Sequence, residues 1–215
     1  MIILHFIYDL SELYRFVPPV RGILSLLQSY GGTVFFLISG TCVTLGHKHL
    51  RRGIVVFGCG LLVSAVSGFA GIPIRFGVLH ALGVCMLLWQ FFKAASAKLL
   101  LFTGLGAVVL GFVFEEFTVT SPLFYPLGLT ASGFESADFF PLFPYLGYFL
   151  LGARLGQILY PRRRSLLGNH EFSGAVSRFF SFCGRHSLLL YLIHQPLLIF
   201  AIESAIFIGG YFHEA

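Results

Sequence analysis

The sequence predicts an all-α protein, a polytopic bundle of transmembrane helices with six full spans and a partial span at its N-terminus. Of the 215 residues, 57% are hydrophobic and only 11% are charged, whereas soluble domains average about 25% charged residues. The mean hydropathy is +0.87. No long polar linker separates the apolar runs, so we expect residues 1–215 to form a single transmembrane domain.

The first apolar segment, residues 1–8, is too short to cross a bilayer. A hydrocarbon core of about 30 Å requires roughly 20 helical residues. We therefore interpret this segment as the end of a helix whose first half lies upstream of Met1; a short re-entrant segment is the alternative. A polar loop that contains Asp9 and Pro18-Pro19 follows, and residues 21–28 are predicted to form a short interfacial helix.

Six longer apolar stretches follow and form the predicted full spans. The fifth contains Pro141 and Pro144 near its start, so we expect a kink or a late helix start there. In the same span Gly152 and Gly156 form a GxxxG pattern, which favours close packing against another helix. The predicted spans cover residues 30–46, 53–71, 76–92, 98–114, 139–160 and 185–209.

The distribution of charge predicts the orientation of the bundle. With residues 47–52 inside, eleven of the fourteen Lys and Arg residues are cytoplasmic and seven of the nine acidic residues are outside. This satisfies the positive-inside rule. We expect a multi-pass protein of the inner (plasma) membrane with an extracytoplasmic C-terminus. The cytoplasmic residues are Lys48, Arg51, Arg52, Lys93, Lys98, Arg154, Arg162, Arg163, Arg164, Arg178 and Arg185.

The last span carries two polar residues, His194 and Gln195, where hydrocarbon is expected. Counted from Arg185 at about 1.5 Å per residue, His194 lies roughly 14 Å along the helix, near the middle of the bilayer. Polar side chains at this depth usually face a bundle interior or a wet cavity and indicate a site. Simple hydrogen bonding between neighbouring helices is the alternative.

A second histidine lies at the opposite end of the chain. His5 is four residues before Asp9, and this spacing places both side chains on one face of a helix. Asp9 could then fix the tautomer of His5 and raise its basicity, as a general base requires. An interfacial histidine beside a surface acid is the structural alternative.

Arg75 and His80 form a third polar group, near the outer end of the third full span. Arg75 is one of three basic residues on the outer side, where the positive-inside rule does not account for it. It could hold an anionic or polar group of a sugar substrate, or it could pair with Asp9 or Glu115. We interpret Arg75 and His80 as candidate substrate-binding residues.

Several absences narrow the chemistry. The four cysteines are scattered, without CxxC or Cys/His spacing, so no metal site is predicted. The sequence contains no P-loop, GxSxG or HExxH motif. The net charge of +5 comes from short loops between apolar segments, which gives no indication of nucleic-acid binding. The basic loops 47–52 and 162–164 are expected to set topology and contact anionic lipid; binding cofactor phosphates is the alternative.

Several stretches together resemble the bacterial members of the heparan-alpha-glucosaminide N-acetyltransferase catalytic-domain family, within the wider group of transmembrane acyltransferases. They are HFIYDL, GGTVFFLISG, RFGVLHALGV, FPLFPYLGYFLLGARLG and GRHSLLLYLIHQPLL. The resemblance implies a membrane acetyltransferase. Its donor is cytoplasmic acetyl-CoA and its acceptor is a hydroxyl or amine of an extracytoplasmic glycan. A homodimer is compatible with this assignment.

The resemblance also implies roles for single residues. His5 matches the first-helix histidine of the wider group, whose partner arginine would precede Met1. His194 and Gln195 match the HQP of the last helix. The implied mechanism has His5, oriented by Asp9, remove a proton from the acceptor, with an acetyl-histidine intermediate as the alternative. Arg75, His80, His194 and Gln195 would line the cavity. The rival hypothesis is a transporter or flippase for a small solute or lipid-linked sugar.

Overall fold

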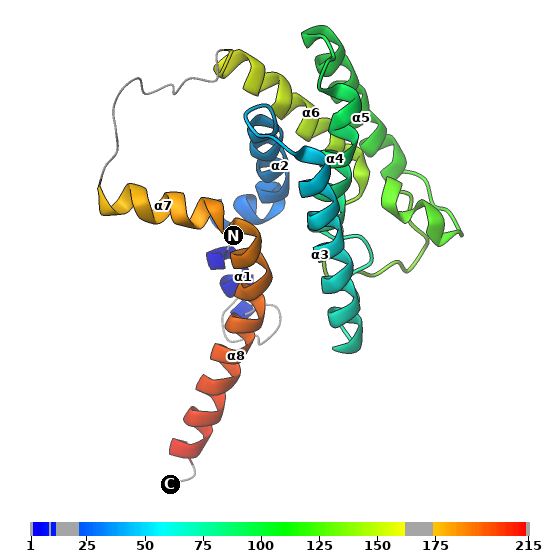
Figure 1. Cartoon of the computed structure of the whole chain (residues 1–215). Helices are drawn as coiled ribbons and strands as arrows, with labels where there is room; N and C mark the ends of the chain where they lie inside the picture. The colour runs from blue at the N-terminus through cyan, green and yellow to red at the C-terminus, as the bar shows by residue number, and fades with distance from the viewer. Residues whose placement is uncertain (1, 9, 12–21, 162–173, 214–215) are drawn as a thin grey trace. The chain divides into compact units, whose positions relative to one another are not determined.

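The computed structural model describes residues 2–8, 10–11, 22–161 and 174–213. These residues form helices and loops, and among them there is no strand beyond two isolated bridges, Phe76–Phe139 and Thr118–Thr130. The all-α prediction is therefore confirmed. In chain order (Figure 1) the helices are α1 (Ile2–Tyr8), α2 (Ile23–Val43), α3 (His49–Phe69), α4 (Val78–Phe92), α5 (Ala97–Glu115), the short 3₁₀ helix η2 (Pro122–Leu127), α6 (Leu142–Leu159), α7 (Ala175–Arg185) and α8 (Ser187–His213).

A helix lies at each of the predicted full spans. By length and composition, three described segments suffice to cross a membrane: His49–Phe69, Ala97–Glu115 and Ser187–Ile206. Two further apolar helices, Ser29–Val43 and Val78–Phe92, are shorter. The chain is thus a membrane protein with several candidate spans. It remains a prediction that α2, α4 and α6 also cross the membrane. The orientation of the bundle in the membrane also remains a prediction.

Two expected boundaries are wrong. The separate interfacial helix expected over residues 21–28 does not form, because the chain from Ile23 continues without interruption into α2. The last helix does not begin at Arg185: α7 ends there, His186 has non-helical dihedral angles, and α8 begins at Ser187. His194 therefore lies about 10 Å from the start of its helix at 1.5 Å per residue, shallower than the sequence indicates.

The chain divides into two compact units, one formed by residues 32–169 and the other by residues 1–31 with 170–215. In the first unit α5 packs along α6 and α3 along α4. Its fully buried side chains are Phe36, Leu100, Phe149, Leu150 and Cys85. In the second unit both α1 and α7 contact α8.

Small residues let α2 and α6 approach each other closely. A Cβ atom added at Gly40 would collide with the backbone of Phe149, and one at Gly152 with the backbone of Leu37. The Thr41 hydroxyl donates to the Gly152 carbonyl oxygen at 2.9 Å across the same contact. A Cβ atom added at Gly156 would lie 2.6 Å from Thr44 Oγ1. The GxxxG pattern therefore does serve helix packing.

Gly152→Leu is expected to lower the free energy of unfolding by about 1–3 kcal/mol, because overpacking forces the helices apart. Thermal unfolding in detergent measures the effect. Gly106→Leu, on α5, is the matched control, since no heavy atom lies within 4 Å of a Cβ placed there. Equal melting temperatures for the two variants would contradict the close contact of α2 with α6.

The start of α6 is irregular, as the two prolines predict. Phe143 has φ −103° and ψ 128°, which are not helical, and the peptide bond to Pro144 is cis. Pro144 is buried against α5 at Gly111, where a Cβ would lie 2.6 Å from Pro144 Cβ. The kink therefore positions Pro144 in the α5–α6 contact.

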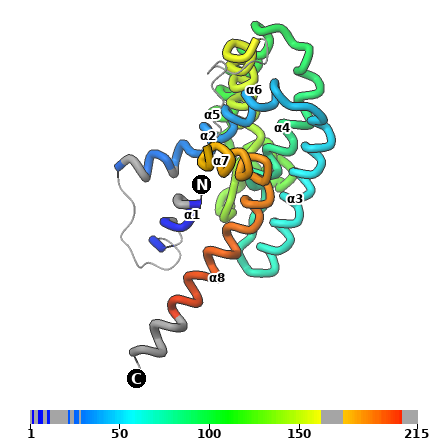
Figure 2. Tube along the Cα trace, turned by 60° about the vertical axis from the view of Figure 1, so that its left-hand side comes forward, coloured from blue at the N-terminus to red at the C-terminus, as the bar shows by residue number. Residues whose placement is uncertain are grey.

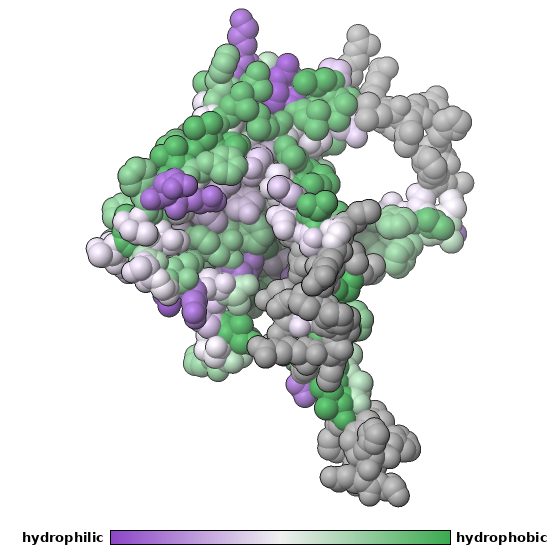
Figure 3. Space-filling model, turned by 180° about the vertical axis from the view of Figure 1, so that it is seen from behind, coloured by the Kyte–Doolittle hydropathy of each residue, from purple (hydrophilic) through white to green (hydrophobic). Residues whose placement is uncertain are grey.

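The exposed side chains of the candidate spans α3 and α5 are largely apolar. Leu61, Leu62 and Val66 on α3 are between 53% and 61% exposed, and Phe102 on α5 is 68% exposed. In the view of Figure 3, apolar residues cover much of the visible face, and hydrophilic residues occur in patches. Side chains of this kind are suited to contact lipid chains, because the transfer of apolar surface from water to an apolar environment is favourable.

Candidate active site

The structure brings His5 and His194 into contact. His5 lies on α1 and His194 on α8, and their ring centroids are 4.9 Å apart with an interplanar angle of 76°. His194 is only 7% exposed, and His5 is partly buried. The sequence singles out both histidines separately, and the fold places them in one group although 188 residues separate them in the chain.

The hydrogen bonding of His194 determines which ring nitrogen carries the proton. Nδ1 lies 2.5 Å from the carbonyl oxygen of Tyr191, and a carbonyl oxygen can only accept. Neutral His194 therefore carries its proton on Nδ1 and has a lone pair on Nε2. Nε2 is buried and makes no hydrogen bond within the described part of the chain. The ring can accept a proton or a hydrogen bond from a substrate at that atom.

The neighbours of this pair are also polar. The Gln195 side-chain oxygen is buried, and the Tyr191 ring lies 5.4 Å from that of His194. Asp9, the expected partner of His5, lies outside the described residues. The His5–Asp9 pair consequently stays a prediction.

His80 occupies a different position, in the unit formed by residues 32–169. It is 4% exposed, and its Nδ1 accepts a hydrogen bond from the Gly77 N–H at 3.3 Å. The ring lies between Phe57 and Phe76, with centroids at 5.5 and 5.4 Å. His80 therefore stabilises the N-terminus of α4, and when neutral it carries its proton on Nε2.

Arg75, in the loop between α3 and α4, contacts the loop that precedes α6. Its backbone N–H donates to Ser136 Oγ at 3.1 Å and its Nε to the Glu135 carbonyl oxygen at 3.1 Å. The guanidinium carbon lies 5.7 Å from the centre of the Phe134 ring. The alternative ion pair with Glu115 is not formed among the described residues, because the side chain turns towards residues 134–136 instead. Asp9, the other alternative partner, lies outside the described residues. Arg75 is exposed, so its terminal nitrogens can still bind a substrate.

Sequence reasoning missed a polar residue in this region, Asp138. Its Oδ2 accepts a hydrogen bond from the Val78 N–H at 3.0 Å, at the first residue of α4. Burial raises the pKa of the Asp138 carboxyl, and the Val78 hydrogen bond opposes that shift. The carboxylate caps a helix that lies 60 residues away in the chain. Such a partner is not apparent from local sequence, which only places Asp138 in an outer loop.

Asp138→Asn and Asp138→Ala should have different effects on stability. Because the folded-state pKa is raised, the charged form opposes folding, and stability falls as pH rises from the unfolded pKa through the folded pKa. The Asn side chain keeps an oxygen that can accept the Val78 N–H, and it carries no charge that opposes folding. We therefore expect the stability of Asp138→Asn at neutral pH to be unchanged or higher. Ala leaves the Val78 N–H unsatisfied and should cost about 1–3 kcal/mol. Thermal unfolding of both variants between about pH 4 and pH 8 measures these effects. A lower melting temperature for Asp138→Asn than for Asp138→Ala would contradict this account.

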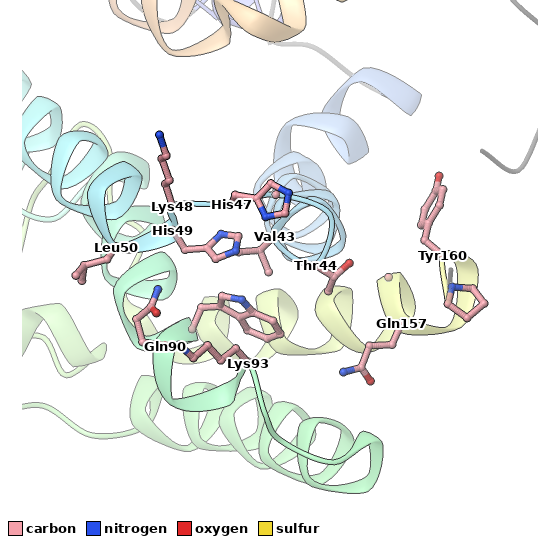
Figure 4. Close-up of a pocket in the computed structure, with 14 residues that line it drawn as sticks. Val43, Thr44, His47, Lys48, His49, Leu50, Gln90, Lys93, Gln157 and Tyr160 are labelled. Atoms are coloured by element: carbon pink, nitrogen blue, oxygen red, sulfur yellow. The ribbon is translucent and has the colours of Figure 1, made fainter. Parts of the chain in front are cut away.

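A cavity of about 760 Å³ opens where the α2–α3 loop meets the C-terminal ends of α4 and α6. Figure 4 shows Lys48, His49 and Lys93 around it, with Gln90 and Gln157 at its edges. None of the residues that line it in the described part of the chain is acidic. The sequence offers phosphate binding by the basic loops 47–52 and 162–164 only as an alternative to a role in topology, and it gives no signal for the contributions from α4 and α6. Residues 162–164 lie outside the described residues. The lining residues are Val43, Thr44, Gly46, His47, Lys48, His49, Leu50, Trp89, Gln90, Lys93, Gly156, Gln157, Tyr160 and Pro161.

These features define an all-α membrane protein with a contacting pair of histidines, one of them buried, and a basic cavity. The comparison with protein families identifies the class further. A family model described as heparan-alpha-glucosaminide N-acetyltransferase, catalytic, matches residues 1–196, and the chain belongs to this family. Searches of curated proteins and of solved structures gave no match.

Membership confirms the resemblance that the sequence motifs indicate. The family implies a membrane acetyltransferase that uses acetyl-CoA. Within the described residues no three His, Cys, Asp or Glu side chains lie close enough to hold a metal ion. The imidazoles of His5 and His194 are candidate reacting groups because the two rings are in contact and His194 Nε2 is buried.

Proposed function

We propose that this protein transfers an acetyl group from acetyl-CoA on the cytoplasmic side to a sugar hydroxyl or amine on the other side of the membrane. The contact between His5 and His194 carries this proposal. It supplies two imidazoles in a mostly apolar protein, one of them with a buried lone pair on Nε2. Imidazole is the side chain best suited to take a proton near neutral pH.

The reaction can be written with these groups. His5 removes the proton from the acceptor hydroxyl or amine, whose oxygen or nitrogen attacks the thioester carbon. The C–S bond breaks, the electron pair leaves on sulfur, and the CoA thiolate takes up the proton. Asp9 orients His5, and His194 and Gln195 hold the acceptor or the thioester carbonyl. The alternative route begins with attack by the imidazole on the thioester, which gives an acetyl-histidine intermediate.

The basic cavity is the proposed site for the phosphates of CoA. Lys48 and Lys93 offer ammonium groups to phosphate oxygens, and Trp89 offers an aromatic surface for the adenine base. Charge-assisted hydrogen bonds to phosphate are about twice as strong as neutral ones. The positive-inside rule predicts that the 47–52 loop is cytoplasmic, which is the side on which acetyl-CoA is expected. Arg75 and His80, at the opposite end of the same unit, are proposed to contact the acceptor.

Lys48→Ala combined with Lys93→Ala should weaken acetyl-CoA binding by about 100-fold or more, since each charged hydrogen bond contributes about 1.5–3 kcal/mol. Isothermal calorimetry in detergent measures the dissociation constant. Lys98→Ala is the matched control, because Lys98 is exposed and does not line the cavity. CoA should compete with acetyl-CoA, and nucleotides that lack the pantetheine arm should compete less well.

Calorimetry also tests the proposed function itself. Saturable binding of acetyl-CoA by the intact chain supports it, and a folded protein that does not bind acetyl-CoA refutes it. Binding that survives both lysine substitutions would leave the donor assignment intact and place the nucleotide elsewhere.

A further inference from the structure

The helix α7 has two chemically distinct sides. At about 100° per residue, Val176, Phe179, Phe180 and Cys183 lie within one arc, with Phe182 at its edge. The opposite arc holds Ser177, Ser181, Arg178 and Arg185. This separation is that of an amphipathic surface helix, since an apolar stripe and a polar stripe face opposite directions.

Among the described residues, the valine and phenylalanine side chains on the apolar side of α7 are exposed. Val176 is 69% exposed, Phe179 62%, Phe180 67% and Phe182 53%. No residue of α7 is buried. Three exposed phenylalanines on an eleven-residue helix form a contiguous apolar patch, and such patches usually indicate a contact surface.

The position of α7 relative to α8 indicates what that surface contacts. The candidate span of α8 begins at Ser187, two residues after α7 ends. Figures 1 and 2 show α7 running across the start of α8 rather than continuing along it. If α8 spans the bilayer, α7 lies at the level of the lipid headgroups. At about 16 Å, an eleven-residue helix is too short to span the membrane itself.

The polar side of α7 carries two positive charges, on Arg178 and Arg185. Within the described residues, the guanidinium groups of Arg178 and Arg185 form no hydrogen bond or ion pair. Basic side chains on the polar face of an interfacial helix bind anionic headgroups. A protein partner would also cover the phenylalanines, but the arginines together with the start of a span favour a membrane surface.

We propose that α7 lies in the membrane interface with its phenylalanines among the acyl chains, and that Arg178 and Arg185 bind anionic phospholipid. The chain has one natural tryptophan, Trp89, which gives a constant background. Phe180→Trp and the matched control Ser181→Trp therefore place reporters on the apolar and polar sides. Both full-length variants are reconstituted into vesicles that contain phosphatidylcholine brominated on its acyl chains.

We expect the added fluorescence of Phe180→Trp to be quenched at least twice as strongly as that of Ser181→Trp. Equal quenching would overturn the orientation of the helix. A blue-shifted but unquenched signal from Phe180→Trp would show that protein covers the face, and would also overturn the proposal.

A second comparison tests the lipid. At equal mole fraction, brominated phosphatidylglycerol should quench Phe180→Trp more than brominated phosphatidylcholine, because each arginine enriches anionic lipid by roughly fivefold. Arg178→Gln with Arg185→Gln, made in the Phe180→Trp protein, should abolish the difference, as should high salt. Equal quenching by the two lipids with both arginines present would refute the proposed selectivity.

Discussion

His5→Ala is expected to lower the rate of acetyl transfer by about 10²–10⁴-fold, the usual contribution of a positioned general base. Binding of acetyl-CoA should be unchanged, because the base acts after the donor has bound. Initial rates of N-acetylglucosamine formation from glucosamine measure the first quantity, and calorimetry measures the second. Asp9→Asn should lower the rate in the same direction if Asp9 orients the ring.

His186→Ala is the matched control for His5→Ala. His186 is an exposed histidine immediately after α7, so its removal should leave the rate unchanged. If His5→Ala retained the full rate in a folded protein, the assignment of His5 as the base would be wrong. Loss of rate together with loss of acetyl-CoA binding would instead indicate a role in binding or folding.

The second large effect is expected at His194, where two substitutions separate the roles of the ring nitrogens. Asn places an amide N–H near the position of Nδ1 and can keep the bond to the Tyr191 carbonyl. Gln places its amide near the position of Nε2. If the buried lone pair on Nε2 serves the reaction, His194→Asn should lose about 10²-fold in rate, and His194→Gln should lose less.

The contact between the two histidines predicts non-additive effects. The His5→Ala/His194→Asn double variant should be about as slow as the slower single variant, because residues that act as a unit do not contribute independently. Rates of all four proteins under the same conditions complete the cycle. Strictly multiplicative losses would show that the rings act separately despite their 4.9 Å centroid separation.

Much of the fold could be predicted from composition and apolar periodicity. The predicted spans coincide with helices, and the irregular start of α6 follows from the prolines. The helix α7 was missed because its phenylalanines lie in a stretch with two arginines and two serines, and an eleven-residue amphipathic helix there resembles a polar loop. The break at His186 has no Gly or Pro at that position to signal it.

The site could be predicted only residue by residue. Intramembrane polarity and the family motifs indicate His5, His194 and Gln195 separately, but their contact depends on how α1 packs against α8. Asp138 caps α4 through a loop contact that sequence spacing does not encode. Trp89 and Lys93 join the basic cavity for the same reason. They come from the C-terminal end of α4, whereas the sequence draws attention to the basic loops 47–52 and 162–164.

The most direct measurement is acetyl transfer by the purified protein in lipid nanodiscs, with acetyl-CoA labelled in its acetyl group and with glucosamine and neutral sugars as acceptors. We expect label in the sugar, one CoA thiol released for each acetyl group transferred, and loss of both with His5→Ala. A folded protein that binds acetyl-CoA but labels no acceptor, or a His5→Ala variant as active as the natural chain, would contradict catalysis at the His5–His194 pair.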